Sequence, residues 1–412
     1  MNSSSTLSGA ANSAFTAVEP RATPRVGIVY RLTHPGGVQS VVLSLIKGLN
    51  QRGIIPELIW DQPPDQDMLD EKGVHAGFHP VALQAPSIML DMAPITVKYI
   101  LVAGNVFTSK SVGKAYDFYY IFFNGFLVND GTPHLYFLNG PPLLPQLDAV
   151  SPGLRGVPYR ILRWLYKVSI RKRYPAYEYH RDSDYVINSQ YTAELFEEAH
   201  GVRLPVVTPP IDVSNRSYRS DDLPERDTIT YFSRFIDYKR PDMVVDLARR
   251  FPHMRVVLMG GVKPNVQEYY DGLVKSAEGL QNVTFLANPS NEKVNEELAR
   301  ARFYIFPGIN EHFGMTTAEA IASGAIPFVH NSGGQREIVP DERLRFTDDE
   351  YASKFQALLD LPESELNQLR SHLSEHIRQY SEEIFIEKML AYLDKAVPSG
   401  SQQAILLPAS NR

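Results

Sequence analysis

Residues 306–339 read FPGINEHFGMTTAEAIASGAIPFVHNSGGQREIV and carry the clearest fold signal in the chain. An apolar run ends at Phe306, Pro307-Gly308 breaks it, and a run of small helix-forming residues follows at 316–323. Gly324 ends that run, and a second apolar run occupies 326–329. A strand, a loop, a helix and another strand in this order indicate a parallel sheet with helices packed against it.

Two carboxylates and a helix start make this stretch a candidate ligand site. Glu311 precedes a helix that we expect to open near Phe313-Gly314, and Glu319 lies farther along that helix. The unpaired N–H groups and the helix dipole favour a phosphate at such a start. The two carboxylates are up to ~12 Å apart at the helical rise, so they suit two ends of an extended polar ligand.

The same alternation extends along most of the chain. The strands that we expect are residues 26–30, 56–60, 116–123, 134–138, 184–188, 205–208, 228–232, 255–259, 283–286, 303–306 and 326–329. The helices that we expect are residues 38–52, 240–251, 266–278, 292–301 and 316–323. The fold class is therefore α/β, with two doubly wound, Rossmann-like domains that face each other across an interdomain cleft.

The domain limits follow from where the alternation stops. The predicted segments are a disordered tail at 1–24, a first domain at 25–209, a linker at 210–226, a second domain at 227–379, a helix at 380–396 and a flexible tail at 397–412. The linker is predicted from its Pro, Ser and paired charges and its lack of periodicity. For the helix at 380–396, packing back on the first domain is one arrangement that we consider.

The composition excludes several classes of function. Forty-one Lys and Arg against forty-seven Asp and Glu give a net charge of −6, so no overall field attracts nucleic acid. The chain has no cysteine, which removes disulfides, thiolate metal sites and a Cys nucleophile. Its eleven histidines show no metal-ligand spacing, so no metal or cofactor is predicted. No apolar run reaches the roughly 18 residues of a membrane-spanning helix, and we expect a cytoplasmic protein.

A basic segment at 154–173, LRGVPYRILRWLYKVSIRKR, has seven basic residues and no acid. Its apolar residues, among them Ile161, Trp164 and Leu165, fall on one helical face. Such a helix suits an anionic membrane surface, which would bring the protein to the cytoplasmic face of a membrane. A helix packed on the core with a solvated basic face is the equally weighted alternative.

Two further loops complete the candidate site. The segment 233–241, SRFIDYKRP, places Arg234 and Lys239 between a strand and a helix, where the two cations suit a diphosphate. Gly36-Gly37 follows the first strand of the first domain and ends it before a helix. The alternative for this glycine pair is a plain turn that needs a positive φ.

Taken together, these motifs resemble the retaining glycosyltransferases of the GT-B fold, family four (group 1), over most of the chain. The resemblance implies that Glu319 binds the ribose of a nucleotide and Glu311 the transferred sugar. It implies that Arg234 and Lys239 stabilise the diphosphate leaving group. The implied donor-binding residues are Gly36, Gly37, Arg234, Lys239, Glu311, His312, Phe313, Gly314, Met315, Thr316 and Glu319, and the implied catalytic residues are Glu311, Arg234, Lys239 and Asn139.

The chain departs from the family pattern at one position. Many members carry a histidine at the end of a first-domain strand, and here Asn139 aligns with it in HLYFLNGP. His134 and His34 lie nearby but do not align. Asparagine can bond a sugar hydroxyl, yet it cannot carry a proton. Ser189, in NSQYTAELF, matches a strand-end serine of the family that precedes a helix.

The function that the resemblance implies is transfer of a hexose from a nucleotide-sugar to an acceptor hydroxyl with retention at the anomeric carbon. The acceptor would be a carbohydrate or a lipid-linked sugar, and we favour GDP-mannose as donor. Two alternatives stay open: a UDP-sugar-dependent GT-B synthase with a soluble acceptor, and a catalytically silent subunit that binds a nucleotide-sugar. An NAD-dependent oxidoreductase is disfavoured because no Gly-x-Gly-x-x-Gly follows the first strand.

Overall fold

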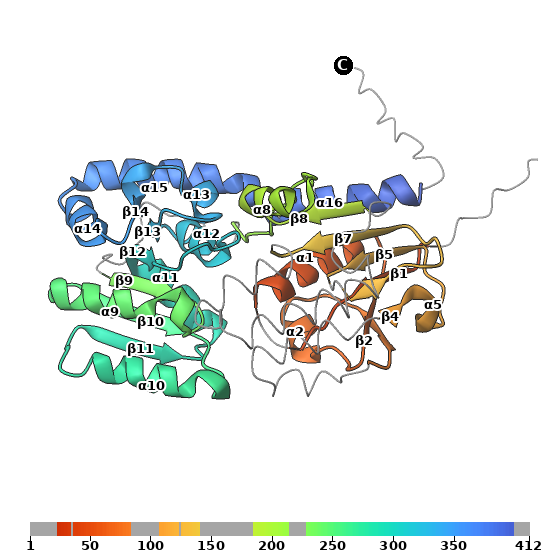
Figure 1. Ribbon diagram of the computed structural model, residues 1–412, viewed down its shortest axis with the longest axis horizontal. Coiled ribbons are helices and arrows are strands. Elements are labelled where there is room, and N and C mark those ends of the chain that lie inside the picture. The colour runs from red at the N-terminus through yellow and green to blue at the C-terminus, as the bar shows by residue number, and fades with distance from the viewer. Residues whose placement is uncertain are drawn as a thin grey trace, which may run out of the picture.

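The computed structural model describes residues 23–33, 36–83, 107–122, 125–140, 184–213 and 228–398. Two six-stranded sheets lie side by side along the molecule, each with its own helices (Figure 1). The strand order is β3-β2-β1-β5-β7-β8 in the first sheet and β11-β10-β9-β12-β13-β14 in the second. Neighbouring strands in both sheets run parallel. The predicted α/β fold class is confirmed.

The first sheet forms because short apolar runs become buried on both faces. All four residues of β1 (Val26–Val29) are buried, and so are all four of β5 (Phe118–Ile121). The other strands are β2 (Glu57–Trp60), β3 (Gly77–Pro80), β7 (His134–Leu138) and β8 (Asp184–Ile187), with a separate pair of β4 (Phe107–Thr108) and β6 (Phe126–Leu127). The helices are α1 (Gly37–Gln51), α2 (Gln66–Glu71), α5 (Ser109–Val112) and α8 (Gln190–His200).

The second sheet repeats this pattern around a core that contains Tyr231, Phe303 and Phe328. Its strands are β9 (Thr228–Phe232), β10 (Arg255–Gly260), β11 (Val283–Ala287), β12 (Ala301–Phe306), β13 (Ile326–His330) and β14 (Arg345–Phe346). Its α-helices are α9 (Pro241–Arg250), α10 (Gln267–Ser276), α11 (Asn291–Arg300), α12 (Met315–Ala322), α13 (Gln335–Ile338), α14 (Tyr351–Leu359) and α15 (Glu363–Ile377). Single 3-10 turns are η3 (Asp237–Lys239), η4 (Pro264–Val266), η5 (Glu342–Leu344) and η6 (Arg378–Tyr380).

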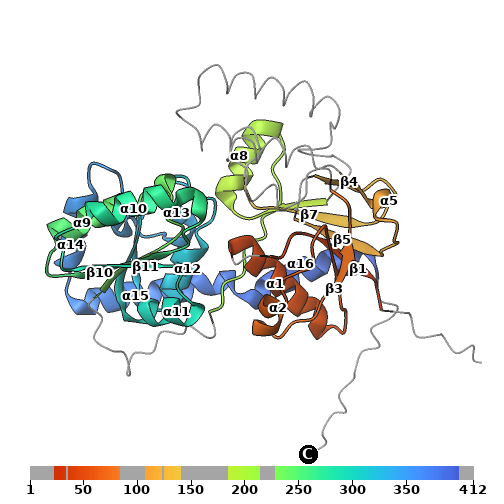
Figure 2. The ribbon, with the colours of Figure 1, turned by 90° about the horizontal axis from the view of Figure 1, so that it is seen from below.

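The last helix, α16 (Glu382–Ala396), follows η6 in sequence but packs on the first domain. Its apolar face enters the core beside α1 and β1 through buried residues, namely Phe385, Met389, Leu390 and Leu393. Gly48 of α1 makes room for it, since a Cβ there would lie 2.4 Å from Ile386 Cγ2. Figures 1 and 2 show the helix running alongside α1. The chain therefore crosses between the domains twice.

Most expected strands agree with the structure to within one or two residues, but one expected strand is absent and one strand was missed. Residues 205–208 form no strand, and only Val206 makes a single bridge to Ile187. The β3 strand was not predicted, because Gly77–Pro80 lacks a β-branched run and ends in proline. The basic segment at 154–173, His34, most of the linker and nearly all of both tails lie outside the described residues.

Candidate active site

The candidate site lies where the strand order of the second sheet reverses. Strand β9 is central, with β10 on one side and β12 on the other. In open parallel sheets, ligands bind beyond the carboxyl ends of the strands at such a reversal, here next to the loops after β9 and β12. These are the loops that carry Arg234 and Lys239, and Glu311 through Gly314.

The loop after β9 is shaped by a buried anchor and a glycine. Phe235 is fully buried, and its N–H donates to the carbonyl of Gly261 at 3.2 Å. The loop passes so close to the end of β10 that a Cβ on Gly260 would lie 1.6 Å from the carbonyl oxygen of Ser233. Only glycine fits there, so the backbone on either side of Arg234 is tightly constrained.

Lys239 and Glu311 form an ion pair across the two loops. Their side chains are 13% and 22% exposed, and the Lys239 ammonium also lies 5.2 Å from the centre of the Phe306 ring. Burial raises the pKa of Glu311, but the charge of Lys239 outweighs it and holds that pKa below its ordinary value. The carboxylate of Glu311 is therefore ionised at neutral pH, and Lys239 is its counter-ion.

Arg234 lies at the open side of the same loop. Its side chain is exposed, and Nη2 donates to the hydroxyl of Tyr238 at 2.9 Å. Its charge also contributes to lowering the pKa of Glu311. The predicted pair of cations thus shares one loop and acts on one carboxylate, with Lys239 inside and Arg234 toward solvent.

The loop between β12 and α12 is held by a second glycine pair that the sequence reasoning left unassigned. The N–H of Gly334 donates to the carbonyl of Glu311 at 2.7 Å. A Cβ on Gly333, where φ is 66°, would lie 2.4 Å from that carbonyl oxygen, and a Cβ on Gly334 would lie 2.4 Å from the carbonyl oxygen of His312. A Gly-Gly pair shortly after a predicted strand was the available signal for this close backbone contact.

The start of α12 meets the first domain. Gly314 caps the helix at φ 111°, a conformation that favours glycine, and the helix begins at Met315. A Cβ on Gly37 would lie 3.0 Å from the sulfur of Met315, so the glycine pair of the first domain does approach this helix closely. Gly36 is extended and Gly37 is helical, so the alternative of a positive-φ turn at this pair was wrong.

The residues in and just before α12 divide between internal and solvent-side positions. The hydroxyl of Thr316 lies 2.8 Å from that of the fully buried Tyr304. Phe313 is 2% exposed and packs edge-on against Tyr380 at 5.3 Å. Glu319 is half-buried and lies in the second turn of α12. The side chains of Thr316 and Phe313 therefore contact internal residues, and the polar groups of the candidate site are the backbone and Glu311.

Asn139 approaches the site through its backbone. Its carbonyl accepts a hydrogen bond from Nδ2 of Asn188 at 2.9 Å, and the imidazole of His312 also bonds to the Asn139 backbone. Burial lowers the pKa of His312, although the charge of Glu311 opposes this effect. A neutral imidazole from the second domain thus lies at the end of β7, a juxtaposition that sequence alone did not reveal.

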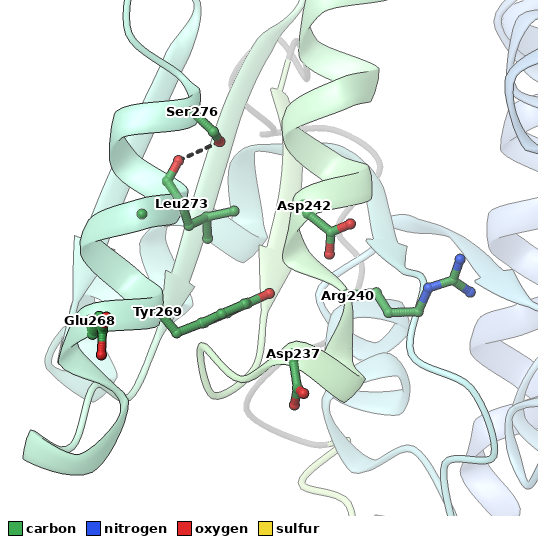
Figure 3. Close-up of a pocket in the computed structure, with 8 residues that line it drawn as sticks. Asp237, Arg240, Asp242, Glu268, Tyr269, Leu273 and Ser276 are labelled. Carbon is green, nitrogen blue, oxygen red and sulfur yellow. Dashed lines mark hydrogen bonds between the residues drawn. The ribbon is translucent and has the colours of Figure 1, made fainter. Parts of the chain in front are cut away.

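A shallow hollow between α9 and α10 is separate from this site (Figure 3). Three carboxylates line it, those of Asp237, Asp242 and Glu268, and Arg240 extends away from it to bond Asp348 at 2.8 Å. An acidic lining would repel a phosphate. Within the described ranges, no helix has the length and apolar character to cross a membrane, and no three His, Asp or Glu side chains are grouped to hold a metal ion.

Comparison with known proteins connects this geometry to a family. Residues 217–380 match the Glycosyl transferases group 1 family. The chain is 26% identical over 234 residues to GDP-Man:Man(3)GlcNAc(2)-PP-Dol alpha-1,2-mannosyltransferase of Dictyostelium discoideum, covering 50% of this chain and 46% of that protein. It is 25% identical over 231 residues to D-inositol 3-phosphate glycosyltransferase of Mycolicibacterium smegmatis, covering 52% of each. The chain spans about half the length of these curated relatives.

Solved structures resemble the whole fold. A crystal structure of Anabaena HepE with UDP-glucose superposes with a TM-score of 0.64 at 15% identity, over 90% of this chain and 100% of that chain. Sucrose-phosphate synthase from Thermosynechococcus elongatus gives 0.68 at 15% identity, over 90% and 99%. Residues 217–380 thus match the Glycosyl transferases group 1 family, and the chain shares with these solved structures the GT-B fold of two Rossmann-like domains.

Proposed function

We propose that this protein transfers a hexose from a nucleotide-sugar donor to an acceptor hydroxyl, with retention, in the synthesis of a glycan, glycolipid or polysaccharide. The observation that carries the proposal is the convergence of Lys239, Glu311 and the start of α12 at one switch point. A cation and helix N–H groups suit the diphosphate, and a carboxylate suits the hydroxyls of a sugar. The group 1 match to this half of the chain supports the same conclusion.

In this proposal the second domain lowers the barrier by stabilising the leaving group. Negative charge grows on the diphosphate as the bond to the sugar breaks, and Lys239, Arg234 and the α12 amides face that charge. When the diphosphate binds, its oxygens share Lys239 with Glu311, which frees lone pairs of Glu311 for the sugar hydroxyls. These cations supply the positive charge, so we propose a reaction that needs no metal.

Retention follows in the proposal from the face on which the acceptor arrives. The acceptor hydroxyl attacks on the side of the leaving group, and a phosphate oxygen takes its proton. No protein nucleophile is then needed. Asn139 bonds through its backbone to His312, and Gly37 approaches Met315, so in this proposal the acceptor side of the site forms where the two domains meet.

We favour GDP-mannose as donor, because relatives such as the Dictyostelium enzyme are named for GDP-mannose transfer. A UDP-sugar is the second candidate, since the similar Anabaena structure holds UDP-glucose. The proposed acceptor is a carbohydrate or a lipid-linked sugar. A subunit that binds the donor without turnover is the remaining alternative, suggested by Asn139 at the position of the family histidine.

A panel of UDP-, GDP-, ADP- and TDP-sugars tests the proposal by thermal shift and by product formation. One donor class should stabilise the protein and be consumed, and Glu311→Gln should lose turnover while the nucleoside diphosphate still binds. Glu268→Gln, in the hollow between α9 and α10, is the matched control and should behave as wild type. Stabilisation without turnover would favour the silent subunit, and no response to any donor would refute the proposal.

A further inference from the structure

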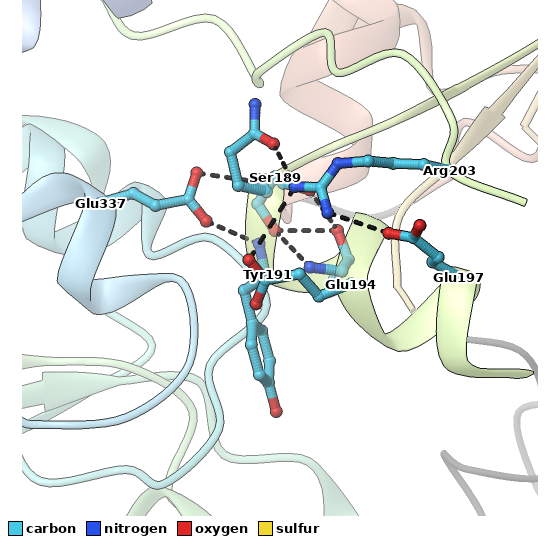
Figure 4. Close-up of polar contacts among 8 residues, drawn as sticks. Ser189, Tyr191, Glu194, Glu197, Arg203 and Glu337 are labelled. Atoms are coloured by element: carbon cyan, nitrogen blue, oxygen red, sulfur yellow. Dashed lines mark hydrogen bonds and ion pairs between the residues drawn. The ribbon is translucent and has the colours of Figure 1, made fainter.

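Glu337, near the end of the short helix α13 in the second domain, bonds the start of α8 in the first domain. Its two carboxylate oxygens accept hydrogen bonds from the backbone N–H groups of Gln190 at 3.0 Å and Tyr191 at 2.8 Å (Figure 4). These are the first two amides of α8, which no carbonyl within the helix can satisfy. A carboxylate is also the charge that a helix start favours.

A second contact joins the same helix start to the candidate active site. The hydroxyl of Ser189, the N-cap residue of α8, donates to the carbonyl of His312 at 2.6 Å and accepts the N–H of Thr192 at 3.0 Å. Ser189 is fully buried. Because His312 follows Glu311 directly, the position of α8 is coupled to the loop that carries the proposed donor ligand.

The backbone of Glu337 is fixed from the other side. Its carbonyl accepts a hydrogen bond from the Tyr380 hydroxyl at 3.0 Å and lies 2.7 Å from Nε2 of His376. Burial raises the pKa of the Glu337 carboxyl, and the two α8 amides oppose that effect. The two amides of the first domain therefore offset part of the cost of burying this charge.

We infer that Glu337 is a positioning residue, whose carboxylate docks α8 on the second domain and thereby keeps the first-domain edge of the site in register with Glu311. The docking contact stands on the geometry alone. Its effect on turnover rests on the proposed function, so the two parts need separate measurements.

Hydrogen exchange tests the docking contact. In wild type the amides of Gln190 and Tyr191 should be protected, and in Glu337→Ala a peptide spanning α8 should lose protection at these two positions. Glu337→Gln keeps one acceptor oxygen and should lose protection at one. Glu198→Gln removes a charge from an exposed position of α8 and should leave exchange unchanged.

Kinetics tests the positioning role. We expect Glu337→Ala to lower kcat on the order of 10-fold, the value of about one charge-assisted hydrogen bond. The affinity for the free nucleoside diphosphate, measured by calorimetry, should stay within about 2-fold, because Glu337 touches none of the proposed diphosphate ligands, Lys239, Arg234 and the start of α12. Glu337→Gln should fall between wild type and Glu337→Ala. A merely structural defect would instead lower nucleotide affinity and the unfolding temperature together.

Each outcome has one meaning. Unchanged exchange at the start of α8 in Glu337→Ala would overturn the docking contact. Altered exchange with unchanged kcat would overturn the positioning role. A wild-type protein that transfers no sugar from any donor would refute the proposed function and the catalytic half of this inference, while the exchange result still decides the docking contact.

Discussion

Replacing Lys239 with methionine tests the electrostatic core of the site. The substitution keeps an unbranched side chain beside Phe306 and removes only the ammonium group. Lys239 and Glu311 are 13% and 22% exposed, so little solvent compensates for the lost partner. A charge-assisted hydrogen bond contributes about 1.5–3 kcal/mol, which corresponds to a loss in kcat/KM of about 10- to 150-fold.

The same substitution changes stability in a pH-dependent way. In wild type the pKa of Glu311 is held below its ordinary value, so its contribution to stability is present at neutral pH and is lost as the pH falls through the lowered pKa. Without Lys239, we expect burial, which is the largest single effect on this group, to raise that pKa, so that the ionised carboxylate destabilises the fold at neutral pH and protonation relieves the cost. The unfolding temperatures of Lys239→Met and wild type should therefore differ most near pH 7 and converge in acid.

The assay combines turnover with thermal unfolding from about pH 7 to about pH 4, a range that spans the ordinary titration of a carboxyl group. A stability loss of about 1–3 kcal/mol would lower the unfolding temperature on the order of 5 °C for a domain of this size. Lys275→Met, at an exposed position of α10, is the control and should show neither effect. Turnover within twofold of wild type, or a temperature gap that stays constant with pH, would refute the assignment of Lys239.

Two glycine substitutions test the backbone contacts. Gly260→Ala places a Cβ 1.6 Å from the carbonyl oxygen of Ser233 and should lower the free energy of unfolding by more than ~3 kcal/mol. Gly272→Ala, with no atom within 4 Å of its Cβ, should stabilise α10 by up to ~1 kcal/mol. Chemical denaturation compares the two variants, and equal midpoints would contradict the contact at Gly260. Gly37→Val should lower kcat/KM roughly 10-fold with little change in stability, because the added valine side chain would clash with Met315 of the other domain. Adding Met315→Ala to the Gly37→Val variant should restore part of the lost kcat/KM. If it restores none, the loss does not come from a clash between residue 37 and α12.

Local sequence patterns predicted the fold well where burial is uniform. Residues 228–232 and 134–138 were expected as strands and are β9 and β7, because apolar and β-branched runs are stable only when both sheet faces are covered. The failures fall at the sheet margins. Strand β3 pairs at an edge with half-buried side chains, so its sequence has little of the apolar signal of a central strand.

The candidate site divides in the same way. Arg234, Lys239, Glu311 and Gly314 are in contiguous motifs, and their loop positions follow from the alternation of strands and helices. The pairing of Lys239 with Glu311 was not predicted, because 72 residues separate them in the chain. The contact between His312 and Asn139 likewise joins two domains, and local sequence patterns do not indicate contacts between segments so far apart in the chain.

The sequence by itself determined the α/β class, the two sheets and the family motifs of the second domain. These features follow from the spacing of apolar residues and glycines, which can be recognised within a few neighbouring positions. Only the tertiary structure decided which charges neutralise each other and what joins the domains. Glu337 illustrates the difference: in the sequence it is one acid among forty-seven Asp and Glu residues. In the fold, its carboxylate accepts from the first two amides of α8, which have no carbonyl partner within that helix.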